Sequence, residues 1–230
     1  MRPLLCLIPA VFILLSTTAA AQQQGIPEDL SMENYSLVDR FRLNLPGRAT
    51  VTETTWKSLY DVVYPARVYS VEKGPNRDSI TVVDYTNGEK LTADLRAKCQ
   101  EGVRCTEGFQ RDLRAAIDYA TWRLSQKYAK LTYIGWDFQD FVEGRLVRFE
   151  NADGTRATAS IYMHENRLYI VESVIAPNEP DRPFVHQSLQ FLDAEGNLVR
   201  YKSIYINGFV TPPRVEQEGN ADFRKRVLGR

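Results

Sequence analysis

Hydrophobic and polar positions alternate with a period of two along several parts of the chain, and this alternation predicts β-strands. The first such part, residues 35–58, is interrupted at Pro46-Gly47, which predicts a hairpin of two strands. Two more strands are expected over residues 66–72 and 78–86, because a dense cluster of turn-forming residues separates them.

Two segments have the spacing of helices. Leu91 and Leu95 lie four residues apart and indicate a short helix. From Phe109 to Tyr128 apolar residues recur every three or four positions, so one side of a long helix is apolar. That apolar stripe needs a hydrophobic surface to pack on, and the predicted sheet supplies one. Its members are Phe109, Leu113, Ala116, Ile117, Ala120, Leu124 and Tyr128.

The strongest β pattern lies within residues 131–175, where four strands are expected. Their turns fall at residues 141–144, 151–154 and 164–166, since Asp-Gly and Asn-containing tips suit positive φ. The last strand, residues 168–175, is apolar on both faces. Such a strand is expected in the middle of a sheet that is covered on both sides.

The C-terminal part of the chain has weaker periodicity. Residues 183–193 predict a helix of two to three turns, and residues 197–206 predict a last edge strand. Residues 207–230 contain two prolines and end in a basic stretch, so we expect a flexible basic tail. One α+β domain over residues 35–206 follows from these elements.

The N-terminus has the three parts of a secretory signal peptide. Arg2 precedes an apolar run over residues 4–15, and small residues follow up to Ala21. The run is shorter than the ~20 residues that span a bilayer as a helix. We predict cleavage after Ala21 and a disordered leader over residues 22–34, with an uncleaved membrane anchor as the alternative.

Export determines how the cysteines are interpreted. Removal of the signal peptide takes Cys6 away and leaves Cys99 and Cys105. A zinc site needs about four ligands, and the chain has only two histidines, both far from these cysteines. A redox pair usually has two residues between its cysteines, whereas five lie here. We therefore predict a structural disulfide, worth roughly 2 kcal/mol through loop closure.

Composition and charge narrow the class of partner. The formal net charge is zero, with 43% hydrophobic and 25% charged residues, which is typical of a globular protein. We therefore expect no nucleic acid as a partner. No second long apolar run follows the first, so no transmembrane segment is expected in the mature chain. No cofactor is expected. The sequence contains no G-x-S-x-G nucleophile elbow, which argues against a hydrolase of that type.

Five segments resemble the PsbP-like fold and are similar to uncharacterised exported proteins of Gram-negative bacteria. They are FRLNLPGRATV, TTWKSLYDVVYPARVYSVE, DLRAAIDYA, ASIYMHENRLYIVES and PFVHQSLQFL, within residues 35–205. The resemblance implies an α+β fold in which helices pack on both faces of an antiparallel sheet, an α/β/α sandwich. It also implies a binding or assembly factor, and it carries no catalytic set onto this chain.

Two groups of polar residues are candidates for chemistry. His164-Glu165 has the residue types of an acid–base pair, although polar residues are expected anyway at the tip of a turn. Asp137, Asp140 and Glu143 lie close enough in sequence for paired-carboxylate or calcium chemistry. Solvated loop charge is the alternative for these three, because strand residues three apart point to opposite faces.

Further candidates lie within the predicted elements. Glu172 interrupts an apolar strand, where a buried carboxylate has a raised pKa unless it pairs with an arginine or lies at an edge. His186 is expected at a surface or rim. Aromatic residues and an arginine gather in one stretch and are candidates for binding, with sheet packing as the alternative. This stretch contains Trp56, Tyr60, Tyr64, Arg67 and Tyr69.

The sequence thus predicts a non-catalytic, exported, periplasmic domain that binds a protein partner or a small ligand. One alternative is a periplasmic hydrolase that uses Glu172, His164 or the acidic run at residues 137–143. The other is an envelope-associated structural protein that uses its basic tail, since each basic residue near an anionic surface contributes ~1 kcal/mol.

Overall fold

A computed structural model describes residues 32–99, 108–216 and 225 of the chain. The predicted signal peptide, most of the leader and Cys105 lie outside these residues, so the cleavage site and the disulfide stay predictions. The described part contains two antiparallel sheets and three helices. No helix within these ranges is long and apolar enough to cross a membrane.

The larger sheet has seven antiparallel strands in the order β3-β4-β5-β9-β8-β7-β6. Its middle strand is β9, as the apolar character of both faces of that segment predicts. The four strands expected within residues 131–175 form a continuous meander, which confirms that prediction. The strands are β3 (Thr50–Lys57), β4 (Val63–Lys73), β5 (Asn76–Asp84), β6 (Lys130–Gln139), β7 (Val142–Glu150), β8 (Arg156–His164) and β9 (Arg167–Ile175).

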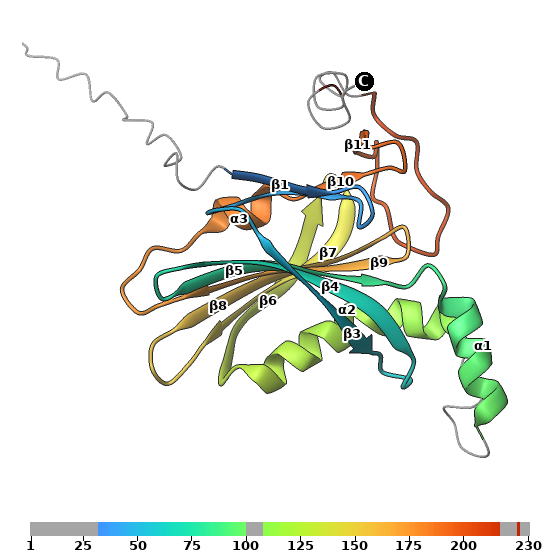
Figure 1. Cartoon of the computed structure of the whole chain (residues 1–230), viewed down its shortest axis with the longest axis horizontal. Coiled ribbons are helices and arrows are strands. Elements are labelled where there is room, and N and C mark those ends of the chain that lie inside the picture. Colours follow the sequence, from blue (N-terminus) through green and yellow to red (C-terminus); the bar gives the residue numbers. More distant parts are fainter. Residues whose placement is uncertain (1–31, 100–107, 217–224, 226–230) are drawn as a thin grey trace, which may run out of the picture.

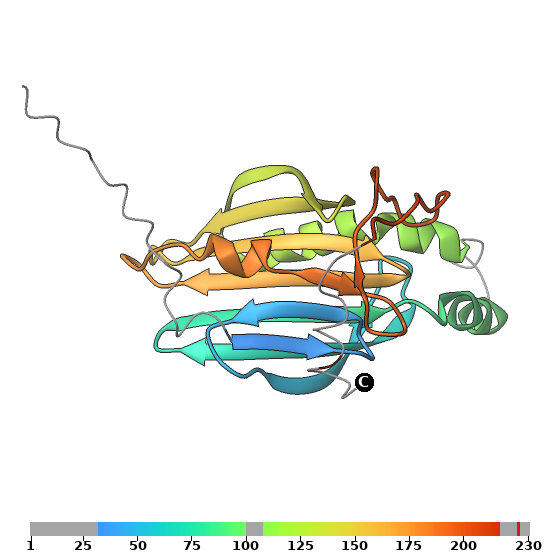
Figure 2. The ribbon, with the colours of Figure 1, turned by 90° about the horizontal axis from the view of Figure 1, so that it is seen from above.

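A smaller sheet lies across one face of the larger one, together with the short helix α3 (Pro183–Gln187) (Figure 1). Figure 2 shows its strands from above, running over the large sheet. Apolar side chains of the two sheets form a single core between them. The strands are β1 (Met32–Ser36), β2 (Phe41–Leu45), β10 (Gln190–Leu192) and β11 (Leu198–Val199), in the order β1-β2-β10-β11.

The long helix α2 (Phe109–Lys127) packs on the opposite face of the large sheet, against β7, β8 and β9 (Figure 1). Its buried apolar residues belong to the stripe expected from the sequence, and they face a second core. Asp112, which lies outside that stripe, is buried as well and accepts a hydrogen bond from the Tyr64 hydroxyl. The short helix α1 (Gly88–Lys98) lies beside the start of α2 and β4. Because α2 covers only three strands closely, the same face of β3, β4 and β5 is left partly open.

The expected sandwich with helices on both faces is wrong, because the protein is mostly antiparallel β-sheet. A second sheet covers the face that was assigned to a helix layer. The helix expected over residues 183–193 ends at Gln187, and Gln190 and Phe191 then pair with Arg42 and Phe41 of β2. Phe191 and Leu192 are adjacent and both fully buried, and a strand that is covered on both faces accounts for this pattern better than an amphipathic helix.

The hairpin expected about Pro46-Gly47 is also wrong. β2 pairs with β1 and β10, whereas β3 pairs with β4. The Pro-Gly segment instead takes the chain from the small sheet to the large one. Asn34 holds this crossing, since its side chain donates to the Gly47 carbonyl and accepts from the Ala49 amide.

The C-terminal segment packs against the domain rather than leaving it at residue 207. Tyr201 and Arg214 form a β-bridge, and the amide of Lys202 donates to the carbonyl of Pro213. Asn207 is buried and bonds Asn166 in the turn between β8 and β9. Part of the segment expected to be a flexible tail therefore packs on the domain. Most of its remaining residues lie outside the described ranges.

Gly144 allows the close approach of β7 to β8. A Cβ atom at this position would overlap the Tyr162 ring and the Ile161 carbonyl oxygen. We predict that Gly144→Ala lowers the free energy of unfolding by ~1–3 kcal/mol, because the backbone on β8 cannot retreat. Denaturant unfolding measures this loss.

Gly108→Ser is the control, because a Cβ atom at position 108 meets open space and serine suits the N-cap position of α2. An equal loss of unfolding free energy in both variants would contradict the packing argument.

Candidate functional site

A hollow of about 420 Å³, here named the seam hollow, lies between α2 and the open part of the large sheet. Its walls come from the last two turns of α2 and from strands β3, β4, β5 and β9. The lining residues are Trp56, Val68, Arg77, Ser79, Thr81, Ala120, Arg123, Leu124, Lys127, Ile170 and Glu172. Trp56 and Glu172 were both candidates from the sequence, and here the structure brings them to one site.

Local periodicity explains how these side chains meet. On β5, Arg77, Ser79 and Thr81 alternate with core residues, so the three share the face toward α2. On α2, Arg123 and Lys127 are four residues apart and flank the buried stripe. The polar residues of β5 therefore face the basic residues of α2 across the hollow.

Ion pairs leave one cation of the hollow without a partner. Glu172 accepts from Lys127 Nζ at 2.7 Å and lies 3.6 Å from Arg77. This pairing matches the alternative that the sequence left open, in which the buried carboxylate has a basic partner. Arg123 forms no ion pair within the described ranges, and its guanidinium lies 4.2 Å from the centre of the Trp56 ring.

A second hollow, here named the apolar hollow, lies further toward the N-terminus of α2 and measures about 480 Å³. The exposed Leu59 and Trp122 line it, together with Tyr119, which stacks on Trp122. Two acidic residues also line it, and both form ion pairs, Asp61 with Lys57 and Asp118 with Arg145. The edge of Tyr119 contacts Trp56 at a centroid distance of 6.1 Å. Since Tyr119 and Arg123 are one helical turn apart, the two hollows follow each other along the same side of α2.

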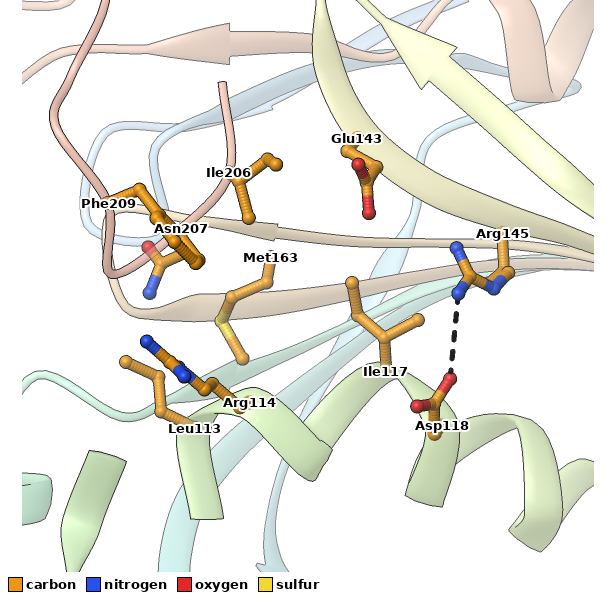
Figure 3. Close-up of a pocket in the computed structure, with 10 residues that line it drawn as sticks. All are labelled: Leu113, Arg114, Ile117, Asp118, Glu143, Arg145, Met163, Ile206, Asn207 and Phe209. Atoms are coloured by element: carbon orange, nitrogen blue, oxygen red, sulfur yellow. Dashed lines mark ion pairs between the residues drawn. The ribbon is translucent and has the colours of Figure 1, made fainter. Parts of the chain in front are cut away.

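The hollow in Figure 3 lies on the other side of α2, between β7 and residues 206–209. An ion pair of 3.9 Å between Arg145 and Asp118 closes one end of it. Its volume of about 110 Å³ holds a few water molecules rather than a ligand of ordinary size. This hollow is therefore not the candidate site.

The four binding candidates do not come together. Trp56 faces α2, whereas Arg67 and Tyr69 lie on the opposite face of the sheet. Both contact Asp39 of the β1–β2 connection, Arg67 at 2.7 Å and Tyr69 through a hydroxyl that donates at 2.6 Å. Tyr60 lies in the β3–β4 turn, half-buried. Only Trp56 lines the seam hollow.

His164 lies in the core rather than at an exposed turn tip. It is completely buried, its Nε2 lies 2.8 Å from the Tyr201 hydroxyl, and its ring contacts Phe191. Burial, together with nearby arginines, lowers the pKa of His164 to about 3. Glu165 points elsewhere and pairs with Arg40 and Arg214. The acid–base pair considered for these two residues therefore does not assemble.

His186 is buried as well, and its Nδ1 lies 3.1 Å from Ser160 Oγ. Burial lowers the pKa of His186 to about 4. Ser160 lies in the middle of β8, where the backbone amides bond neighbouring strands and are not free to hold an oxyanion. A serine–histidine contact is thus present without the donors that acyl transfer needs.

The acidic run is divided between different partners. Asp137 accepts from the Tyr162 hydroxyl at 2.6 Å, and Asp140 lies 3.9 Å from Arg200. Glu143 lines the small hollow of Figure 3. Within the described part of the chain, no group of three or more His, Cys, Asp or Glu side chains is placed to hold a metal ion.

Sequence reasoning missed the cations of the seam hollow. Arg123 and Lys127 lie outside the apolar stripe of the predicted helix, where charged side chains of an amphipathic helix are expected in any case. The signal that points to them is their four-residue spacing on the flank of the stripe, combined with the hydroxyl-bearing row on β5. Recognising it requires knowing which strands α2 leaves uncovered.

No protein-family model matches the chain, and no curated protein matches it. The PsbP-like resemblance therefore stays a prediction.

The two buried histidines predict a stability that falls in acid. Their folded pKa values, about 3 and about 4, lie below the ordinary 6.5, so the unfolded chain binds more protons as the pH drops below ~6.5. Each histidine should remove up to ~1.4 kcal/mol of unfolding free energy per pH unit between pH 6 and 4.

Denaturant unfolding of the native protein and of His164→Phe across this range measures the effect of one histidine. Burial raises the pKa of Asp112, which acts in the opposite direction, so the difference between the two proteins is the relevant quantity. Parallel stability–pH curves for the two proteins would contradict a buried neutral His164.

Proposed function

We propose that the chain is an exported, non-catalytic binding domain of the periplasm, whose ligand is a small amphipathic anion. The main support for this proposal is the environment of Arg123 in the seam hollow. Arg123 has no carboxylate partner among the described residues and lies against an indole ring. An anionic group is the natural partner for a guanidinium in such a place, because it can form charge-assisted hydrogen bonds.

The head of the ligand would lie among three basic side chains. Arg77, Arg123 and Lys127 together carry three positive charges, and Glu172 balances only one of them. The hydroxyls of Ser79 and Thr81 line the same hollow and offer additional donors. This arrangement suits a carboxylate, sulfonate or phosphate group.

The apolar part of the ligand would lie along the next hollow. The exposed Leu59 and Trp122 and the half-buried Tyr119 form a hydrophobic surface there. Trp56 and Tyr119 are in contact at the boundary. Both hollows fall within the ~300–1,000 Å³ that is usual for small-molecule sites. An aromatic or short acyl anion would span the boundary and bury apolar surface on both sides of it.

Export is part of the same proposal and is supported by the N-terminal pattern. Arg2, the apolar run at residues 4–15 and the small residues before Ala21 have the order of a cleavable signal. The PsbP-like resemblance adds support for a binding role.

A fluorescent aromatic sulfonate, 8-anilinonaphthalene-1-sulfonate, is a suitable probe because it combines an anion with fused rings. We expect saturable binding by the native protein, and about tenfold weaker binding by Arg123→Gln, since one charge-assisted hydrogen bond contributes ~1.5 kcal/mol. Fluorescence titration gives both dissociation constants.

Arg145→Gln is the matched control. Arg145 also lies over an indole ring, that of Trp136 at 3.5 Å, but it lines the other side of α2. Its removal should leave probe affinity unchanged. Equal affinities for native protein and Arg123→Gln, or an equal loss in both variants, would rule out the seam hollow as the anion site.

A further inference from the structure

The edge strand β6 carries an unusual amount of exposed hydrophobic surface. Trp136 is 61% exposed and Ile134 is 53% exposed, and Leu131, Tyr133 and Phe138 are also exposed. β6 pairs with β7 on one side and ends the seven-stranded order on the other, so its outer backbone groups have no strand partner in the described chain. An edge of this kind is a template for another strand.

The opposite edge of the same sheet is built differently. Outer strand β3 carries four threonines, Glu53 and Lys57, and most of its side chains are exposed. Polar and charged residues of this sort discourage pairing with other chains. The exposed side chains of β3 are thus mostly polar, whereas those of β6 include several large hydrophobic residues. We therefore expect another strand to cover the β6 edge.

We propose that β6 pairs with β6 of a second copy of this chain, antiparallel and across a two-fold axis, so that the two large sheets become one. The sequence of β6 is suited to antiparallel pairing with a second β6. If the axis passes through Gly135, Ile134 of each copy lies opposite Trp136 of the other, and both belong to the face that carries α2. Aromatic and β-branched residues are favourable cross-strand partners.

The other face of the strand fits the same register. Tyr133 lies opposite Asp137 of the second copy, so no two like charges face each other there. Gly135 lies at the axis. The Tyr133 ring of the same strand lies over it, at a place where a Cβ atom on residue 135 would overlap the ring. A tyrosine that shields an edge glycine is a recognised way to stabilise such a strand.

Charge supports a second copy over an unrelated strand. Lys130 begins β6, and Asp137 and Asp140 lie at its other end. Antiparallel pairing of two copies brings the basic end of each strand to the acidic end of the other. The bulge between Leu131 and Tyr133 shifts the register only at the outer end of the pairing, away from the axis.

The pairing is independent of the proposed ligand site. The seam hollow lies between α2 and the β3–β5 half of the sheet, and β6 forms the far edge. A dimer through β6 would leave both hollows open. Loss of one property is therefore not expected to abolish the other.

Sedimentation velocity of the purified protein over a range of micromolar concentrations tests the pairing. We expect a dimer for the native protein and a monomer for Trp136→Glu, which places a charge opposite Ile134 of the partner. Val51→Glu is the control, because Val51 is an exposed apolar residue on the opposite edge of the same sheet. It should remain dimeric, and circular dichroism should show the native sheet signal in both variants.

Engineered cysteines test the register. Copies with Ile134→Cys mixed with copies with Trp136→Cys should form an intermolecular disulfide several times faster than either variant alone, because directly opposite side chains are the closest pairs. A native protein that stays monomeric throughout, or a dimer that survives Trp136→Glu, would overturn the proposal. A monomer that instead binds an unrelated strand at β6 would overturn it as well.

Discussion

The structure depends on the burial of β9, the middle strand of the large sheet. Leu168 and Ile170 face one core, whereas Tyr169 and Val171 face the other, so neither side of the sheet can be left to solvent. Burying four such side chains is worth several kcal/mol, at ~1.5–3 kcal/mol each. Both faces of the large sheet must therefore be covered, one by the helix α2 and the other by the small sheet.

Local periodicity is enough to predict most of the elements but not their partners. The helix α2 and the meander from β6 to β9 follow from spacing within the segments, because neighbouring strands are joined by short turns. The small sheet joins β2 to β10 across nearly the whole domain, and nothing local in Phe41 or Phe191 specifies that pairing. His164 was misplaced for the same reason, since the residues that bury it come from a distant segment.

The candidate site shows the same division between local and distant information. Glu172 was recognisable as a carboxylate inside an apolar strand, and Trp56 as part of an aromatic stretch. Arg123 gains its significance only from the position of α2, which rests on β7, β8 and β9 and leaves the strands beside it partly open. A charged residue on the flank of a helix has the same sequence pattern whether it meets solvent or lines a hollow.

The ion pair between Lys127 and Glu172 connects the last residue of α2 to the central strand. An anion that enters between Arg77 and Lys127 competes with this carboxylate for the ammonium group. If the proposed anion binds there, it would replace this ion pair within the protein with a contact through the ligand. Hydrogen exchange in the last turn of α2 would then report whether the anion is bound.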